Sequence, residues 1–346
     1  MNTKEHVLRL LEECKGKSIS GNQIAKELNL SRAAIWKAIK DLRQNGYDIK
    51  ASTNKGYSLC IESDLLSRQG IVSHLKNKVL GEHILTYQSL ESTNQTLKKL
   101  SADGACHNTV VVSEMQTKGR GRLGRSFYSP KGSGIYMSLL FKPPHSSQSN
   151  FPSVFITTAA SVAVCRAIEE VTGKQIKIKW VNDLFYNNKK ICGILTEGIT
   201  NFETGAIESI IIGIGINFSS PSDKFPSELT EIFGSLYQDQ EEASHCTFSE
   251  SHAIPTKNLL IASILDHFFD IQAELKSGSF LEEYKQRSCV LGKRITVLSP
   301  TESIPAIAVD INETGGLIVE QLDGTRKTLQ SGEISIRPED LSSGWK

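Results

Sequence analysis

The first 60 residues carry three helical stripes of apolar side chains, followed by a turn between two short strand-like runs. Apolar residues recur there every three to four positions, which predicts three short helices. The stripes occupy residues 4–14, 20–30 and 31–46. Residues 47–61 then read as two strands around the turn 53–56. Two helices joined by a tight turn and followed by a hairpin predict a winged helix-turn-helix.

The outward face of the third predicted helix is basic. It carries Arg32, Trp36, Lys37 and Lys40, and Lys55 stands at the tip of the hairpin. In a winged helix, the first three would approach base edges and the last two would lie near phosphates. A three-helix interaction module with a solvated basic face is the alternative, but it leaves the exposure of Trp36 unexplained.

Helical and strand-like patterns alternate in the middle of the chain. One helix is expected to begin at Ser92 or Thr93, and residues 157–173 predict a longer, buried helix. Three β-rich runs lie around the turns 187–188 and 203–205. Consecutive strands joined by short turns form a meander, so the central sheet should be largely antiparallel.

Residues 258–278 predict an amphipathic helix, and five short strands follow from about Cys289, typical of a small SH3-like β-barrel. The intervening stretch 219–257 is rich in Ser, Pro and acidic residues and is interpreted as a connector. We therefore expect an α/β protein of the α+β type with three domains. These are a winged helix-turn-helix at 1–64, a central domain at 65–288 and an SH3-like domain at 289–346.

Composition adds a charge division between the modules. Residues 1–60 hold 11 Lys and Arg against 6 Asp and Glu, a charge of +5, while the remaining 28 basic and 32 acidic residues give −4. A basic module ahead of an acidic body favours nucleic-acid binding. The seven cysteines show no C-x-x-C spacing, which argues against a disulfide framework or a zinc site. Neither a signal peptide nor a membrane span is indicated, so we expect a cytoplasmic protein.

The stretch GRGRLGR at 119–125 fits the dinucleotide-binding pattern G-x-G-x-x-G, but its flanks do not. That pattern requires a helix after the last glycine and an acidic residue about 20 positions further on. Here Ser129-Pro130 and other turn residues follow instead, and the acidic residue is missing. The Walker A spacing is absent too.

The arginines of this loop alternate with glycines that cannot shield them, so their charges repel one another. A multiply charged anion would relieve this repulsion, because arginine forks fit carboxylate and phosphate oxygens and glycine lets backbone N–H groups approach. On the motif alone, a solvated basic loop remains an equal alternative.

Five motifs in fixed order carry a family resemblance. They are ESTNQ at 91–95, EMQTKGRGRLGR at 114–125, KWVNDL at 179–184, KICGIL at 190–195 and GIGIN at 213–217. Behind a winged helix and ahead of a small β domain, they resemble the bifunctional biotin protein ligases that double as biotin operon repressors, over nearly the whole chain. Val181 stands where the family usually has proline, and Ser331 where it has glycine. Neither departure removes a functional side chain.

The resemblance implies a central sheet like that of class II synthetases and an ATP- and Mg²⁺-dependent reaction. Biotin would be activated to biotinyl-5′-AMP and transferred to a lysine of a biotin carboxyl carrier protein, a subunit of acetyl-CoA carboxylase or of another biotin-dependent carboxylase. It further implies binding to operator DNA as a ligand-promoted homodimer.

The same resemblance implies the site residues. Biotin would contact Ser92, Thr93, Asn94, Gln116, Arg120, Gly121, Arg122 and Lys190. ATP and the adenylate would contact Gly119, Arg122, Arg125, Asn182 and Asn217. The catalytic groups would be Arg120, Arg122, Lys190 and Asp183, with Asp183 also binding the metal. Alternatives are helix capping for Ser92 or Thr93 and a turn cap for Asp183.

Two other functions remain open at this stage. A biotin-sensing DNA-binding regulator without ligase activity would need the winged helix and the biotin pocket but no catalytic charges. Arg120, Arg122, Asp183 and Lys190 are all present, which favours the ligase. A lipoate or other acyl ligase is the third interpretation.

Overall fold

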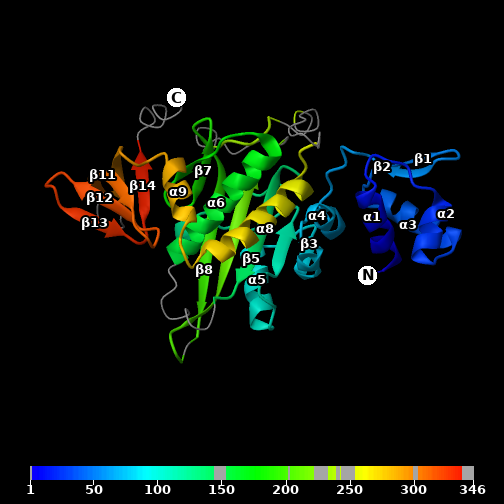
Figure 1. The fold of residues 1–346 in the computed structure, drawn as a ribbon, viewed down its shortest axis with the longest axis horizontal. Coiled ribbons are helices and arrows are strands. Elements are labelled where there is room, and N and C mark those ends of the chain that lie inside the picture. Colours follow the sequence, from blue (N-terminus) through cyan, green and yellow to red (C-terminus); the bar gives the residue numbers. More distant parts are fainter. Residues whose placement is uncertain are drawn as a thin grey trace.

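The computed structural model describes residues 2–143, 153–201, 203–221, 233–238, 242, 254–298 and 303–336. The basic N-terminal module lies at one end of the molecule, a seven-stranded sheet with its helices in the middle, and a five-stranded sheet at the other end (Figure 1). Most of the predicted connector 219–257 falls outside the described residues. Across the described ranges, no helix combines the length and apolar character needed to cross a bilayer.

The N-terminal module is a winged helix-turn-helix, as predicted. Its elements are α1 (Thr3–Glu13), α2 (Gly21–Leu28), α3 (Arg32–Gln44), β1 (Ile49–Ser52) and β2 (Gly56–Leu59). Ser20 and Ser31 cap α2 and α3 by accepting the backbone N–H groups of Gln23 and Ala34. Gly56 has a φ of +97°, and a Cβ there would meet the Ile19 carbonyl oxygen, so the hairpin fits closely against the helices only with glycine.

A short joint connects this module to the body through α4 (Arg68–His74) and the 3₁₀ helix η1 (Lys78–His83). The backbone N–H of Leu66 donates to the buried carboxylate of Glu114 at 2.8 Å. Nearby, the Lys257 N–H donates to Asp64 at 2.7 Å, and the Lys257 ammonium donates to the Gly132 carbonyl at 3.0 Å. The joint is therefore fastened to segments that lead into the central sheet.

The central sheet has the order β3-β4-β5-β9-β8-β7-β6. Only β3 and β4 pair in parallel, so the prediction of a mixed, largely antiparallel sheet is confirmed. The predicted meander is β7–β8–β9. The strands are β3 (Ile84–Tyr87), β4 (Val110–Ser113), β5 (Gly134–Phe141), β6 (Lys177–Lys179), β7 (Asp183–Tyr186), β8 (Lys189–Thr200) and β9 (Ile207–Asn217).

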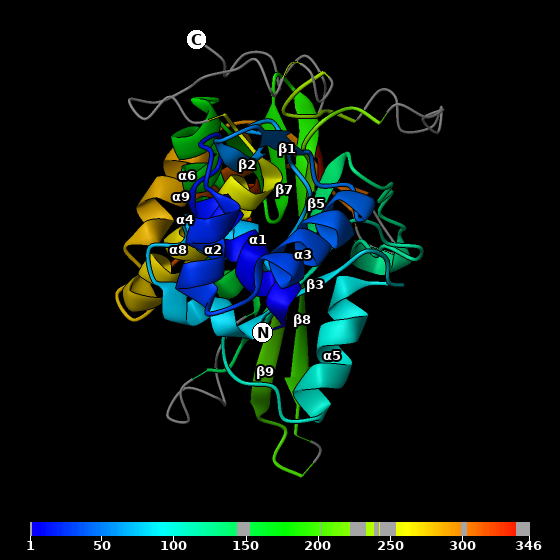
Figure 2. The same cartoon turned by 90° about the vertical axis from the view of Figure 1, so that its right-hand side faces the viewer.

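Helices cover both faces of this sheet. Alternate strand residues point to opposite sides, so each face presents apolar side chains that the helices bury. On one side α6 (Ser153–Thr172), α8 (Lys257–Glu274) and α9 (Phe280–Arg287) enclose the main hydrophobic core. On the other side α5 (Thr93–Ala102) buries Leu97 against a smaller cluster with Val111, Leu140 and Ile211. Figure 2 shows α5 on the opposite side of the sheet from α6, α8 and α9.

The last five strands form one antiparallel sheet in the order β13-β12-β11-β10-β14. They are β10 (Arg294–Leu298), β11 (Ser303–Ile311), β12 (Leu317–Gln321), β13 (Arg326–Leu329) and β14 (Glu333–Ile336). The five predicted strands are confirmed; among the described residues, β13 and β14 stand at the two ends of this order and do not pair with each other.

Candidate functional site

The glycine- and arginine-rich stretch 119–125 forms a compact turn on the wall of a cavity that is also lined by residues of β7, β8 and β9. The single 3₁₀ turn η2 (Arg122–Gly124) follows the first glycines, and no helix opens on the last one. Dinucleotide binding of the Rossmann type is thereby excluded. A Cβ at Gly119 would lie 2.3 Å from the Phe127 carbonyl oxygen, so only glycine lets the two arms of the turn approach.

Two of the three loop arginines already have partners, which differs from the expectation of unpaired, mutually repelling charges. Arg122 donates to the Asn182 side chain at 3.0 Å and to the Gly332 carbonyl at 2.8 Å. Arg125 donates to both carboxylate oxygens of Glu333, at 2.7 and 2.9 Å. Gly332 and Glu333, at the start of β14, lie more than 200 positions from the loop, so the local sequence does not reveal these contacts.

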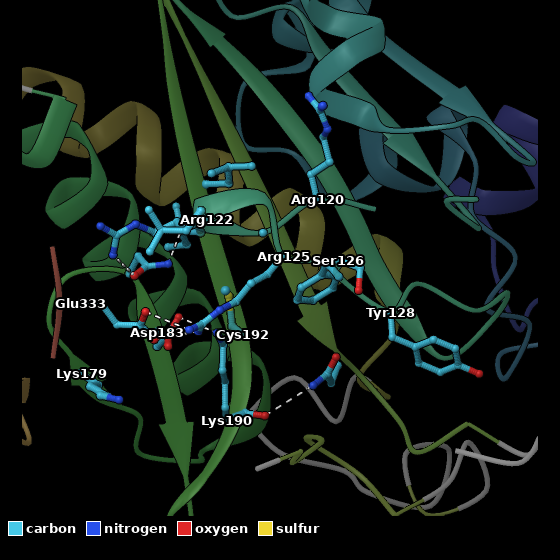
Figure 3. Close-up of a pocket in the computed structure, with 18 of the residues that line it drawn as sticks. Arg120, Arg122, Arg125, Ser126, Tyr128, Lys179, Asp183, Lys190, Cys192 and Glu333 are labelled. Atoms are coloured by element: carbon cyan, nitrogen blue, oxygen red, sulfur yellow. Dashed lines mark hydrogen bonds and ion pairs between the residues drawn. The ribbon is translucent and has the colours of Figure 1, made fainter. Parts of the chain in front are cut away.

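Arg120 has a different orientation. Figure 3 shows its side chain pointing away from Arg122 and from the strands that carry Asp183 and Lys190. It lies at the junction of two cavities, whereas Arg122 and Arg125 line only the larger one. The three arginines therefore do not form a single cluster.

Asp183 and Lys190 face each other across neighbouring strands. The Lys190 ammonium lies 2.7 Å from the Asp183 carboxylate, and both side chains are partly exposed to the larger cavity. A register shift between β7 and β8 pairs Phe185 with Lys190 and Leu184 with Cys192. Asp183 thus lies in a strand, and its carboxylate pairs with a lysine. It does not cap a turn, which was the alternative.

The two asparagines assigned to the nucleotide are tied into the backbone. Asn182 donates to the Ile194 carbonyl at 2.9 Å while its oxygen accepts from Arg122. Asn217 donates to the Gly234 carbonyl at 2.8 Å, with a longer contact to the Lys190 carbonyl at 3.4 Å. Both residues line the larger cavity, so they shape its wall.

The smaller cavity lies between the start of α5 and strands β8 and β9. Ser92 occupies the N-cap position, but its side chain makes no capping hydrogen bond and faces this cavity. The Thr93 N–H and hydroxyl both donate to the side-chain amide oxygen of Gln116, at 2.8 and 3.1 Å. Helix capping by these two side chains is therefore wrong, and Thr93 is fastened to Gln116 instead.

Glycines make room for two side chains on the wall of this cavity. A Cβ at Gly215 would lie 2.6 Å from the Phe127 ring, and one at Gly213 would lie 2.2 Å from the Asn94 side-chain oxygen. Four residues border both cavities, so the small cavity opens onto the large one. They are Arg120, Phe127, Gly193 and Leu195.

Several residues of the larger cavity were missed from the sequence. Lys179 and Trp180 line it from the start of the KWVNDL motif, and Glu333 lines it from β14. The first two lie inside a recognised motif, which was a usable signal. Cys192 also lines the cavity; burial raises the pKa of its thiol well above the usual value, so it stays neutral and is a poor nucleophile.

A magnesium ion can be accommodated only with help from a substrate. Within the described residues, no group of three or more His, Cys, Asp or Glu side chains is placed to hold a metal. Magnesium is commonly held by one or two carboxylates together with substrate phosphates and water. Asp183, on the wall of the larger cavity, suits that mode of binding.

The predicted DNA-contacting residues lie on α3 and at the tip of the hairpin. Arg32, Trp36, Lys37, Lys40 and Lys55 are all exposed, with 59% of Trp36 accessible. The Lys40 ammonium lies 5.4 Å from the centre of the Trp36 ring. Arg32 and Trp36 border an open groove between α3 and the hairpin, the surface that a winged helix offers to a duplex.

Family comparisons cover most of the chain. Residues 86–217 match the Biotin/lipoate A/B protein ligase family, residues 3–58 match an HTH domain, and residues 290–337 match the Biotin protein ligase C terminal domain.

Individual relatives also match large parts of the chain. The bifunctional ligase/repressor BirA of Bacillus subtilis is 40% identical over 235 residues, covering 68% of this chain and 71% of the relative. The protein of the same name from Escherichia coli is 27% identical and covers 93% of this chain and 94% of its own length. A biotin protein ligase from Aquifex aeolicus, solved in complex with biotin and ATP, has a TM-score of 0.58 at 25% identity and covers 74% of this chain and 99% of that chain. This chain belongs to the family of bifunctional biotin protein ligases and repressors.

Proposed function

We propose that this protein is an ATP-dependent biotin protein ligase that also represses transcription in response to biotin. The observation that carries the proposal is the joined pair of cavities. The small one has hydroxyl and amide groups suited to a compact polar ring, and it opens beside Gly193 onto a larger one bordered by Arg122, Asp183 and Lys190. Biotin has this shape, a bicycle with a ureido group at one end and a carboxylate at the other.

In the first step the biotin carboxylate attacks the α-phosphorus of ATP. The bond between the α- and β-phosphates breaks, and pyrophosphate leaves with biotinyl-5′-AMP remaining. Both reactants are anionic, so the protein contributes mainly by placing them together and by neutralising charge. Lys190 lies beside Gly193, where the two cavities meet, and Arg122 lines the larger cavity; we assign them this role together with Arg120.

The ion pair between Lys190 and Asp183 adds a way to hold the ammonium in place before substrates bind. We assign Asp183 to magnesium, which would neutralise the phosphates when bound. Ser92, Thr93, Gln116 and Gly121 are assigned to biotin, and Gly119, Arg125, Asn182 and Asn217 to the nucleotide. In the second step an acceptor lysine amine attacks the carbonyl carbon of the adenylate, AMP leaves, and the amine gives up a proton.

The acceptor is proposed to be a biotin carboxyl carrier protein in the cytoplasm, and the DNA partner an operator. Domain limits of 1–64, 65–288 and 289–346 are proposed with it. The open groove bordered by Arg32 and Trp36, together with the exposed lysines of α3 and the hairpin, supports the DNA assignment. We further propose a ligand-promoted homodimer, because two winged helices related by a two-fold axis match two operator half-sites.

Biotin-dependent exchange of radioactive pyrophosphate into ATP tests the first step directly. The proposed ligase should show exchange only when biotin is present. Lipoate should not replace biotin, and exchange with lipoate alone would favour an acyl ligase of another specificity. Biotin binding without any exchange would instead favour a DNA-binding biotin sensor that does not catalyse.

A further inference from the structure

Asn94, on the first turn of α5, has a side chain that is almost completely enclosed by the protein. Only 4% of the residue is accessible. Its amide nitrogen donates to the Glu197 carboxylate at 2.6 Å and to the Leu195 carbonyl at 3.3 Å. Its oxygen accepts from the Ser138 hydroxyl at 2.6 Å. An asparagine amide has two donor hydrogens and both are already used, so Asn94 borders the small cavity without a free donor to offer a ligand.

The position of Glu197 follows from strand alternation. On β8, Gly193 and Leu195 point to the α5 side of the sheet and border the small cavity, and Glu197 is the next residue on that side. The hydroxyl of Thr196, on the opposite face, is hydrogen-bonded to the hydroxyl of Thr157 on α6 at 2.8 Å. Glu197 therefore stands just beyond the end of the cavity, where it reaches Asn94.

A carboxylate can only accept hydrogen bonds, so Glu197 fixes which way the Asn94 amide faces. With the nitrogen turned toward Glu197, the oxygen must face Ser138. Gly213 of β9 lies against the same amide, since a Cβ there would come within 2.2 Å of its oxygen. The first turn of α5 is thus fastened to three strands through one side chain, and it lacks a side-chain cap that could do this instead.

We propose that Asn94 and Glu197 are positioning residues that set the affinity for the ring of biotin without donating a hydrogen bond to it. They hold the start of α5 so that Ser92 and Thr93 keep their places on the wall of the small cavity. This inference replaces hydrogen-bond donation from Asn94 to biotin and rests on the proposed function for the identity of the ligand. The residues of the larger cavity are held by other contacts, such as that between Arg122 and Asn182, so the effect is confined to biotin.

Exchanging donor and acceptor provides the test. Asn94→Asp brings two carboxylates into contact, and biotin binding measured by calorimetry without ATP should weaken by about tenfold or more. Glu197→Gln should change it by less than about threefold, because the glutamine oxygen still accepts from Asn94. The double variant Asn94→Asp with Glu197→Gln restores a bond with reversed polarity and should recover part of the lost affinity, since the Leu195 carbonyl still lacks its donor. In exchange assays, KM for biotin should follow these changes while KM for ATP stays the same.

A matched control lies on the same hairpin. The Asn201 amide donates to the Glu208 carboxylate at 2.7 Å, far along β8 and β9 from either cavity. Asn201→Asp makes the same charge clash but should leave biotin affinity unchanged. Asn94→Asp with wild-type affinity, or a double variant that folds yet stays as weak as Asn94→Asp, overturns the proposal.

If Asn94→Asp does not fold, Glu197→Ala tests the same bond without adding charge. It should weaken biotin binding by about threefold to tenfold, and unchanged affinity overturns the proposal. These binding measurements do not depend on catalysis. A wild-type protein that binds biotin but shows no pyrophosphate exchange would contradict the ligase function. The measured biotin affinities of the variants would still decide this inference.

Discussion

The carboxylate of Glu333 on β14 accepts two hydrogen bonds from the guanidinium of Arg125, at 2.7 and 2.9 Å. This bidentate pair and the bond from Arg122 to the Gly332 carbonyl tie the glycine-rich loop to the C-terminal sheet. The Arg125 side chain is 68% exposed, and an exposed ion pair contributes at most about 1 kcal/mol. The pair matters because it helps to order the loop, whose glycines lose much conformational entropy when the loop adopts one structure.

Glu333→Gln should therefore loosen the loop without unfolding the protein. The expected result is tryptic cleavage at the loop arginines that is up to about fivefold faster, the equilibrium factor for about 1 kcal/mol. Glu320→Gln is a matched control, because Glu320 forms a similar exposed pair with Arg326 on the same sheet. Equal cleavage rates in the two variants would show that the Arg125–Glu333 pair does not order the loop.

The pair between Lys190 and Asp183 leads to a second prediction. Lys190→Ala removes a cation from the place where the two cavities meet, and formation of the adenylate should slow by about 3 to 4 kcal/mol of barrier, a factor of hundreds. Single-turnover formation of biotinyl-5′-AMP measures this rate. Lys189→Ala is the control, since Lys189 is the exposed neighbour at the start of β8. An adenylation rate within about twofold of wild type would remove Lys190 from the chemistry.

Much of this fold could be predicted because the patterns that define it are local. The caps at Ser20 and Ser31, the meander turns and the breakers after the glycine-rich loop each act within a few residues. They were sufficient to identify the winged helix, to predict an antiparallel meander and to reject a Rossmann turn.

The site was less predictable, because its key contacts join distant segments. The partner of Arg125 lies 208 positions away, and that of Asn94 lies 103 positions away. Such contacts depend on how sheets and helices pack, which no short pattern specifies. Asn94 could be identified from its motif as a site residue. Only the structure shows that both of its amide hydrogens already have acceptors.

DNA binding gives a third prediction, separate from catalysis. Lys37 is exposed on α3 of the N-terminal module, beside the groove residue Trp36. Lys37→Ala should weaken DNA binding and reduce the slope of log affinity against log salt by about 1, the value for one lost phosphate contact. Pyrophosphate exchange should not change. Lys98→Ala removes an equally exposed charge from α5 and should leave the salt slope intact.

The last prediction concerns retention of the reactive intermediate. Arg122 bridges the loop, Asn182 and the C-terminal sheet, and it borders the larger cavity. If these contacts close the loop over biotinyl-5′-AMP, Arg122→Gly should still form the adenylate, because Lys190 remains, but should release it sooner into water. Free adenylate acylates exposed amines, so a bystander protein rich in lysine should acquire biotin. Dimerisation promoted by biotin and ATP should weaken in the same variant, since an open loop cannot complete a ligand-dependent surface.

Both readouts are needed to separate closure from chemistry. Adenylate release is followed by trapping with hydroxylamine, and the dimer by sedimentation with and without biotin and ATP. Arg125→Gly is the informative comparison, because it removes only the exposed ion pair with Glu333. Arg122→Gly removes two partly buried hydrogen bonds, to Asn182 and Gly332, so the Arg125 variant should release less adenylate. If Arg122→Gly forms adenylate at a normal rate yet neither labels the bystander nor loses dimer, the loop does not retain the intermediate, and its arginines act only on the substrates.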